Sequence, residues 1–186
     1  MKKGDFGYIS FMKKKSGISA ALLALAAASL YFTGLHFFPQ NRTAVGIVTV
    51  VVCIPAAMAL VRFIMFMRFP SGSREIYELT ERIKGRVPVF YDSIITTPDK
   101  SYGVNVFIAS EGSLIGLTEY DGVDIQKLEK HLKDLFTANK YHELNIRVFT
   151  DRGRFTERLE ALAKRQDGGD LKKELSILHL IGRLSL

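Results

Sequence analysis

Two carboxylates stand in segments that are otherwise apolar, and they are the residues with which this chain could do chemistry. Asp92 lies in the middle of residues 87–97, and Glu119 is the last residue of the segment 114–119. Both segments are rich in strand-forming side chains. Paired carboxylates can act as general acid and base or hold a divalent cation when a fold brings them together. Their spacing does not require this, and an edge or solvent-facing position explains Asp92 equally well. Asp92 and Glu119 are therefore catalytic candidates whose roles depend on the fold.

The sequence contains none of the common motifs for phosphate binding, dinucleotide binding, zinc hydrolysis or serine hydrolysis. The single cysteine, Cys53, excludes a disulfide framework and a cysteine-rich zinc site. The histidines lie far apart, and none has a second ligand at a spacing of four residues; they are His36, His131, His142 and His179. We therefore expect neither a metal site nor a cofactor.

The net charge of +7 is confined to the first part of the chain. Residues 1–71 hold eight Lys or Arg and one acid, whereas residues 72–186 hold 18 bases and 18 acids. A nucleic-acid-binding domain needs a basic surface to pair with phosphates, and the balanced second part offers no such excess. Nucleic acid is therefore not expected as a partner.

Two apolar stretches are long enough to cross a membrane. Residues 17–38 carry no charged side chain, and residues 44–67 carry only Arg62. A bilayer core of about 30 Å needs about 20 helical residues, and a helix of a soluble protein normally keeps a polar face. The five residues between the stretches make the two helices antiparallel neighbours. We predict a transmembrane helical hairpin over residues 17–67; a cleaved signal peptide is the alternative for the first stretch.

Positive charges flank the hairpin mainly on one side. Residues 1–16 are basic, whereas the loop between the helices holds only Arg42. The positive-inside rule then places both termini in the cytoplasm, which predicts an integral protein of a plasma or inner membrane. Membrane lipids are the first expected partners, since basic side chains are attracted to anionic headgroups. The residues expected at headgroups are Lys13, Lys14, Lys15, Arg62 and Arg68.

Small residues recur along one face of the first apolar stretch, at Gly17, Ala21, Ala24 and Ala28. Small side chains allow membrane helices to approach closely. Packing inside the hairpin is the favoured use of this face, and formation of a homo-oligomer is the alternative.

The second part of the chain predicts a cytoplasmic α+β domain over residues 72–166, with a linker at 166–169 and a C-terminal amphipathic helix at 170–186. Short turns between successive strands imply an antiparallel meander. In the second strand, Val104, Val106 and Ile108 are expected on one face. The expected order is a helix at 74–84, strands at 87–97, 102–109 and 114–119, a helix at 125–136, a strand at 144–149 and two helices.

This order of elements over residues 74–149 resembles restriction-endonuclease-like folds, including membrane-attached nuclease-related domains. Such enzymes hold Mg²⁺ with an Asp in the second strand and an acid-x-Lys pattern in the third. The matching positions here are Asn105, Leu117 and Glu119. One carboxylate is too few for metal-assisted phosphoryl chemistry, so the resemblance implies a non-catalytic relative.

Together these features favour a membrane-anchored cytoplasmic binding or scaffold module that is not an enzyme and has a protein partner or a second copy. One alternative is a divergent nuclease-like or other hydrolase domain that uses Asp92 and Glu119. The other is an accessory subunit of a membrane assembly.

Overall fold

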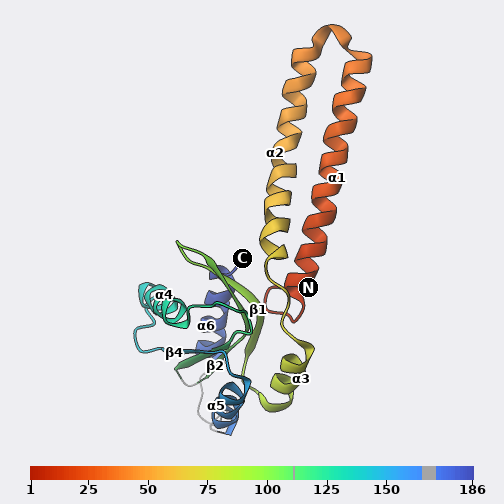
Figure 1. Ribbon diagram of the computed structural model, residues 1–186. Helices are drawn as coiled ribbons and strands as arrows, with labels where there is room; N and C mark the ends of the chain where they lie inside the picture. The colour runs from red at the N-terminus through yellow and green to blue at the C-terminus, as the bar shows by residue number, and fades with distance from the viewer. Residues whose placement is uncertain (111, 165–170) are drawn as a thin grey trace. The chain divides into compact units, whose positions relative to one another are not determined.

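The computed structural model describes residues 1–110, 112–164 and 171–186, which form two compact units (Figure 1). The first, called here the hairpin unit, is Ile9–Pro70. The second, called the α+β unit, combines Met1–Tyr8 with Ser71–Leu186. The first eight residues therefore belong to the α+β unit, although the hairpin separates them from it in sequence.

The hairpin unit consists of helices α1 (Tyr8–Phe37) and α2 (Arg42–Met67), joined by a short 3₁₀ turn, η1 (Pro39–Asn41). Both helices are long and apolar enough to cross a membrane. Helix α1 begins at Tyr8 rather than at residue 17, because the lysine- and serine-containing segment before the apolar stretch contains no helix breaker and continues the same helix.

The two helices pack along a seam with alternating four- and three-residue spacing, the pattern of coiled coils. The less exposed positions of α1 include Ser16, Ala20, Leu23, Ala27 and Gly34, and those of α2 include Val45, Thr49, Val52, Ala56, Ala59 and Phe63. Close approach is most evident at two glycines. A Cβ atom on Gly17 would lie 2.9 Å from the ring of Phe63, and one on Gly34 would lie 2.6 Å from a methyl group of Val45.

The α+β unit has the predicted order of elements, which confirms the fold class. Strands β1, β2 and β3 form an antiparallel meander, and β4 lies parallel to β3, in the sheet order β1-β2-β3-β4. A parallel neighbour needs a crossover, which α4 supplies. The elements are α3 (Arg74–Ile83), β1 (Val89–Thr96), β2 (Ser101–Ser110), β3 (Ser113–Leu117), α4 (Ile125–Ala138), β4 (Asn145–Phe149), α5 (Arg152–Lys164) and α6 (Leu171–Leu184).

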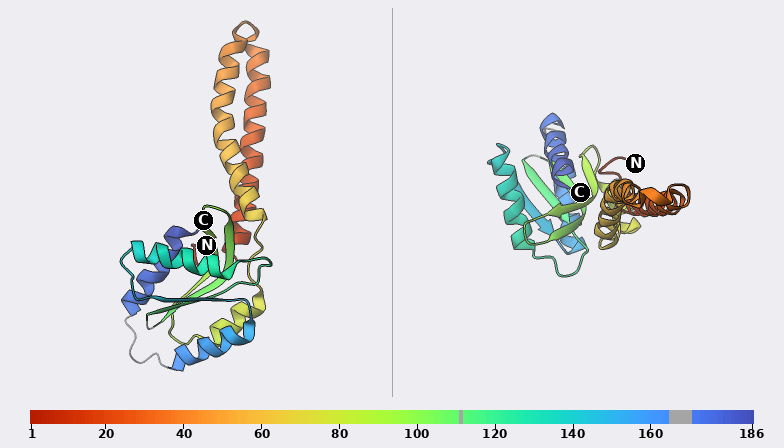
Figure 2. Two further views of the ribbon diagram at one scale, coloured as in Figure 1. Left: turned by 60° about the vertical axis from the view of Figure 1, so that its left-hand side comes forward. Right: turned by 90° about the horizontal axis from the view of Figure 1, so that it is seen from above.

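Helices cover both faces of the sheet, and each face has its own hydrophobic core (Figure 2). The first core joins the sheet to α4 and α6, through residues such as Phe136 and Ile181. The second joins it to α3 and α5, through residues such as Ile76 and Phe155. The predicted C-terminal helix is thus packed on the domain itself. The predicted linker at residues 166–169 lies outside the described residues.

Both chain termini cover the outer edge of strand β1. The backbone N–H of Tyr91 donates to the carbonyl of Gly4 at 2.9 Å, and the N–H of Leu186 donates to the carbonyl of Ile94 at 3.1 Å. The ammonium group of Lys3 also donates to the carbonyl of Ser185 at 2.9 Å, which links the two termini. An open strand edge is a template for aggregation, so this arrangement protects β1.

We expect Gly4→Ala to destabilise the α+β unit by about 2–4 kcal/mol, combining left-handed backbone strain with overpacking. Gly4 has a φ of 93°, and an added Cβ would lie 2.7 Å from the ring of Phe90. Gly122→Ala is the matched control, because Gly122 has a φ of 69° but open space around its Cβ position. Urea unfolding of the full-length chain in detergent, followed by circular dichroism, measures both. Equal losses of stability in the two variants would contradict the packing of Gly4 on β1.

Candidate functional site

A group of polar side chains lies where β1, β2 and the end of β3 meet. It comprises Asp92, Asn105, Glu119, Tyr120 and Arg152 and is called here the polar cluster. Asp92 is 3% exposed and Asn105 is 4% exposed, so both polar groups are buried within the sheet. Burying a carboxylate is costly unless hydrogen bonds satisfy it, which makes the surroundings of Asp92 the first feature to explain.

Asp92 has a left-handed backbone conformation, with a φ of 48°. Its neighbours Tyr91 and Ser93 pair with Val106 and Val104, so Asp92 stands opposite Asn105 without a ladder pair of its own. Asp adopts the left-handed region more readily than most residues. Asp92 therefore lies in an edge strand, as one sequence interpretation held, but it does not face solvent.

The strands exchange faces at this point. Val104 lies in the first core, whereas Val106 and Ile108 lie in the second. The prediction that Val104, Val106 and Ile108 share one face is therefore wrong. The left-handed residue Asp92 interrupts the alternation of side chains in β1, and the alternation in the paired strand β2 shifts at the opposite residue, Asn105. The interruption is what allows two polar side chains, Asp92 and Asn105, to be buried in the middle of two apolar strands.

The Asp92 carboxylate binds both segments that connect the α+β unit to the hairpin. Its Oδ2 accepts a hydrogen bond from the N–H of Gly7 at 2.8 Å, and its Oδ1 accepts one from the N–H of Gly72 at 2.9 Å. Gly7 immediately precedes α1, and Gly72 follows α2 by five residues. A Cβ on Gly72 would lie 3.1 Å from Nδ2 of Asn105, so only glycine fits there without displacement. One buried carboxylate thus binds two segments of the α+β unit that adjoin the hairpin in sequence.

The chain after β3 is attached to β2 by side-chain hydrogen bonds. The N–H of Glu119 donates to Oδ1 of Asn105 at 2.6 Å, and the hydroxyl of Thr118 donates to the carbonyl of Gly103 at 2.8 Å. The ring of Tyr120 covers Gly103 so closely that no side chain could replace the glycine hydrogen. These contacts hold Glu119 and Tyr120 beside the middle of the sheet.

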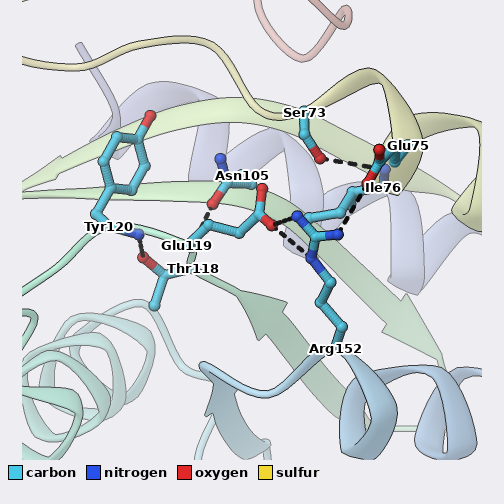
Figure 3. Close-up of polar contacts among 8 residues, drawn as sticks. All are labelled: Ser73, Glu75, Ile76, Asn105, Thr118, Glu119, Tyr120 and Arg152. Atoms are coloured by element: carbon cyan, nitrogen blue, oxygen red, sulfur yellow. Dashed lines mark hydrogen bonds and ion pairs between the residues drawn. The ribbon is translucent and has the colours of Figure 1, made fainter.

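Arg152 neutralises Glu119 and links three elements (Figure 3). Its Nε donates to Oε1 of Glu119 at 2.7 Å, and its terminal nitrogens pair with Glu119 and, at 3.0 Å, with Glu75. The side chain of Glu119 is 22% exposed, whereas those of Arg152 and Glu75 are 51% and 81% exposed. These hydrogen bonds raise the pKa of the Arg152 guanidinium above its ordinary value, first through Glu119 and then through Glu75.

The charges of both candidate carboxylates, Asp92 and Glu119, affect the pKa of the Tyr120 phenol. Burial raises the pKa of Tyr120 well above its ordinary value, and the negative charges of Asp92 and Glu119 raise it further. The structure therefore brings Asp92 and Glu119 into one cluster. Their oxygens, however, already serve backbone N–H groups and Arg152. Among the described residues, no group of three or more His, Cys, Asp or Glu side chains is arranged to hold a metal ion.

The three positions matched to the nuclease pattern do not converge as side chains around one point. Asn105 and Glu119 belong to the polar cluster, where the contact uses the backbone N–H of Glu119. Leu117 is 1% exposed and packs in the second core. Sequence reasoning did not single out Gly7, Gly72, Tyr120 or Arg152 as site residues.

The predicted headgroup-facing residues all belong to the hairpin unit. Lys13, Lys14 and Lys15 lie in the first turns of α1, where Lys13 is half-buried and the other two are exposed. Arg62 lies near the end of α2, and Arg68 follows its last residue; both are exposed.

The predicted small-residue face lies beside the helix seam. Ala21, Ala24 and Ala28 are exposed and Gly17 is half-buried, whereas Ala20 and Ala27 are buried in the seam.

Comparison with known proteins adds no family to these observations. No family model matches the chain, and no curated protein or solved structure matches it.

Replacing Asp92 tests its part in the fold. We expect Asp92→Ala to lower the free energy of unfolding by roughly 3–5 kcal/mol, because two N–H groups lose their acceptor and alanine is strained at a φ of 48°. Asp92→Gly removes the acceptors without the strain, and Asp92→Asn keeps one acceptor oxygen and tolerates the backbone. The expected order of stability is wild type, Asn, Gly, Ala, measured by urea unfolding of the full-length chain. An Asp92→Asn variant less stable than Asp92→Gly would contradict these roles.

Proposed function

We propose that this chain is a membrane-anchored module whose cytoplasmic α+β unit binds a protein partner at the membrane and is not an enzyme. The observation that carries the proposal is the double contact of Asp92 with Gly7 and Gly72. Its carboxylate, one of two catalytic candidates, holds the segments on either side of the hairpin. The anchored glycines are separated from the helices by at most four residues, so the tether is short.

The hairpin supports membrane anchoring by its surface. Of the most apolar 18-residue windows in the two helices, 6% and 0% of the residues are buried inside the structure. The core helix of a soluble protein would be mostly covered by the rest of the chain. Lipid is the environment that would cover these side chains. The lysines ahead of the first apolar stretch and the arginines near the end of α2 then favour a cytoplasmic location for both termini.

The polar cluster supports binding over catalysis. Asp92 accepts hydrogen bonds from two backbone N–H groups, and Glu119 is paired with Arg152. Using either carboxylate on a metal or a substrate would break contacts that hold the connections and the end of β3. The exposed surfaces of α3, α4 and α5 remain as surfaces for a partner.

Cysteine labelling tests the orientation. In a Cys53→Ala background, Asn41→Cys places a thiol in the hairpin loop, and Glu160→Cys places one on the exposed side of α5. We expect a membrane-impermeant maleimide to label residue 41 in intact spheroplasts and to label residue 160 only after permeabilisation. The reverse pattern would overturn the orientation, and labelling of both residues in intact spheroplasts would overturn the hairpin.

Photo-crosslinking in cells tests the binding function. A photoreactive amino acid introduced at successive exposed positions of α3, α4 and α5, such as Lys130 and Glu157, is expected to give a discrete adduct from one of these faces. An adduct of twice the chain mass identifies a second copy as the partner. Introduction at the buried Leu159 serves as the control and should give none.

The enzyme alternative predicts a different result. Calorimetric titration of the purified full-length chain with Mg²⁺ or Mn²⁺ should give no saturable binding. Saturable binding that is lost in Glu119→Gln, together with no crosslinked adduct from any exposed position, would contradict the proposal and favour a hydrolase.

A further inference from the structure

The hairpin unit has a groove on the outside of its seam, formed by two hollows that share Gly17 and Phe63. The first hollow has a volume of about 550 Å³, and its lining residues are Ser10, Lys13, Lys14, Gly17, Ile18 and Phe63. The second has a volume of about 520 Å³ and is lined by alanines of both helices together with Leu60. Because they share two lining residues, the hollows adjoin each other, and together they are called here the hairpin groove.

Small side chains create this groove. Gly17, Ala21 and Ala24 form one wall on α1, and Ala56 and Ala57 form the other on α2. If these positions carried leucines, the larger side chains would occupy the space that is now the groove. The groove is therefore long and apolar, and its small side chains leave room for a flexible hydrocarbon chain.

Charge distinguishes the hollows at the two ends of the hairpin. Lys13 and Lys14 line the first hollow of the groove, and no carboxylate is among the described residues that line it. The hollow at the loop end of the hairpin, about 310 Å³ in volume and including Leu30, Gly34 and Asn41 in its lining, has no charged residue in the described part of the chain. The hairpin thus has a cationic apolar groove at one end and an uncharged hollow at the other.

The length of the groove matches one leaflet of a bilayer. Ala24 lies eleven positions after Lys13, which is about 16 Å along a helix. The hydrocarbon core of a bilayer is about 30 Å thick, so half of it is close to the same length. A lipid with its headgroup at the lysines would have its acyl chain beside the alanines.

We propose that the hairpin groove binds one anionic phospholipid of the leaflet on the side of the chain termini. Its phosphate pairs with Lys13 and Lys14, and one acyl chain lies along Gly17, Ala21 and Ala24. This inference rests on the proposed insertion of the hairpin. It goes beyond general attraction of basic residues to a membrane, because it assigns one lipid to one groove and gives Lys14 a role that Lys15 lacks.

Native mass spectrometry of the full-length chain, released from detergent micelles with added lipid, tests the assignment. Phosphatidylglycerol and phosphatidylcholine with the same acyl chains are the two probes. We expect one phosphatidylglycerol to be retained in preference, and Lys14→Gln to weaken its retention about fivefold. Lys15→Gln is the matched control, since it removes the same charge from the adjacent exposed position outside the groove.

A second pair of variants tests the apolar part. Ala24→Leu fills the groove and should lower phospholipid retention, whereas Ala26→Leu adds the same side chain at an exposed position outside it. Equal effects of Lys14→Gln and Lys15→Gln, or no effect of Ala24→Leu, would overturn the groove assignment. A dimer that Ala24→Leu disrupts, without retained lipid, would show that the groove holds a second copy instead.

Membrane insertion is measured separately, by resistance of the vesicle-reconstituted chain to alkaline extraction. A chain that is extracted contradicts the proposed function itself. A chain that resists extraction but retains phosphatidylglycerol and phosphatidylcholine equally contradicts the lipid site alone.

Discussion

A carboxylate that is withdrawn from water must be given hydrogen-bond donors, and in this chain that constraint falls on Asp92. Its donors are the backbone N–H groups of Gly7 and Gly72, which lie 65 residues apart in sequence on either side of the hairpin. Residues 71–186 supply one of these two donors, and the segment before α1 supplies the other, so that segment contributes to satisfying the buried carboxylate. The same segment then supplies Lys3 and Gly4 to the edge of the sheet.

The backbone at Asp92 also determines what surrounds it. A left-handed residue in β1 interrupts the alternation of side chains, so β2 changes face at Asn105 and both polar side chains can be buried there. Asn105 in turn accepts from the N–H of Glu119, which places Glu119 within reach of Arg152 at the start of α5. The arrangement of the polar cluster thus depends on the left-handed backbone and the burial of Asp92.

The order of elements was predictable because hydrophobic periodicity and turn residues indicate each helix or strand from its own short stretch of sequence. Apolarity predicts a membrane span from residue 17 but not the start of the helix that contains it, because the preceding lysines continue that helix to Tyr8. The face exchange at Asp92 was not predictable, since Asp is compatible with both an ordinary strand and a left-handed position. The helix seam at Ala20 and Ala27 was also hidden, because a helix that is apolar on every side gives no direction to its packing face.

The candidate site shows the difference between finding a residue and finding its role. Asp92 and Glu119 were identifiable as carboxylates in apolar strands, and the structure does place both near Tyr120. Their partners include two glycine N–H groups and, for Glu119, the guanidinium of Arg152 at the start of α5. A backbone N–H donor cannot be recognised from the sequence. A carboxylate can therefore suggest an acid site by its residue type, although its contacts in the structure show that it stabilises the fold. In this chain, the most chemically suggestive residue is the one that accepts hydrogen bonds from the segments on both sides of the hairpin.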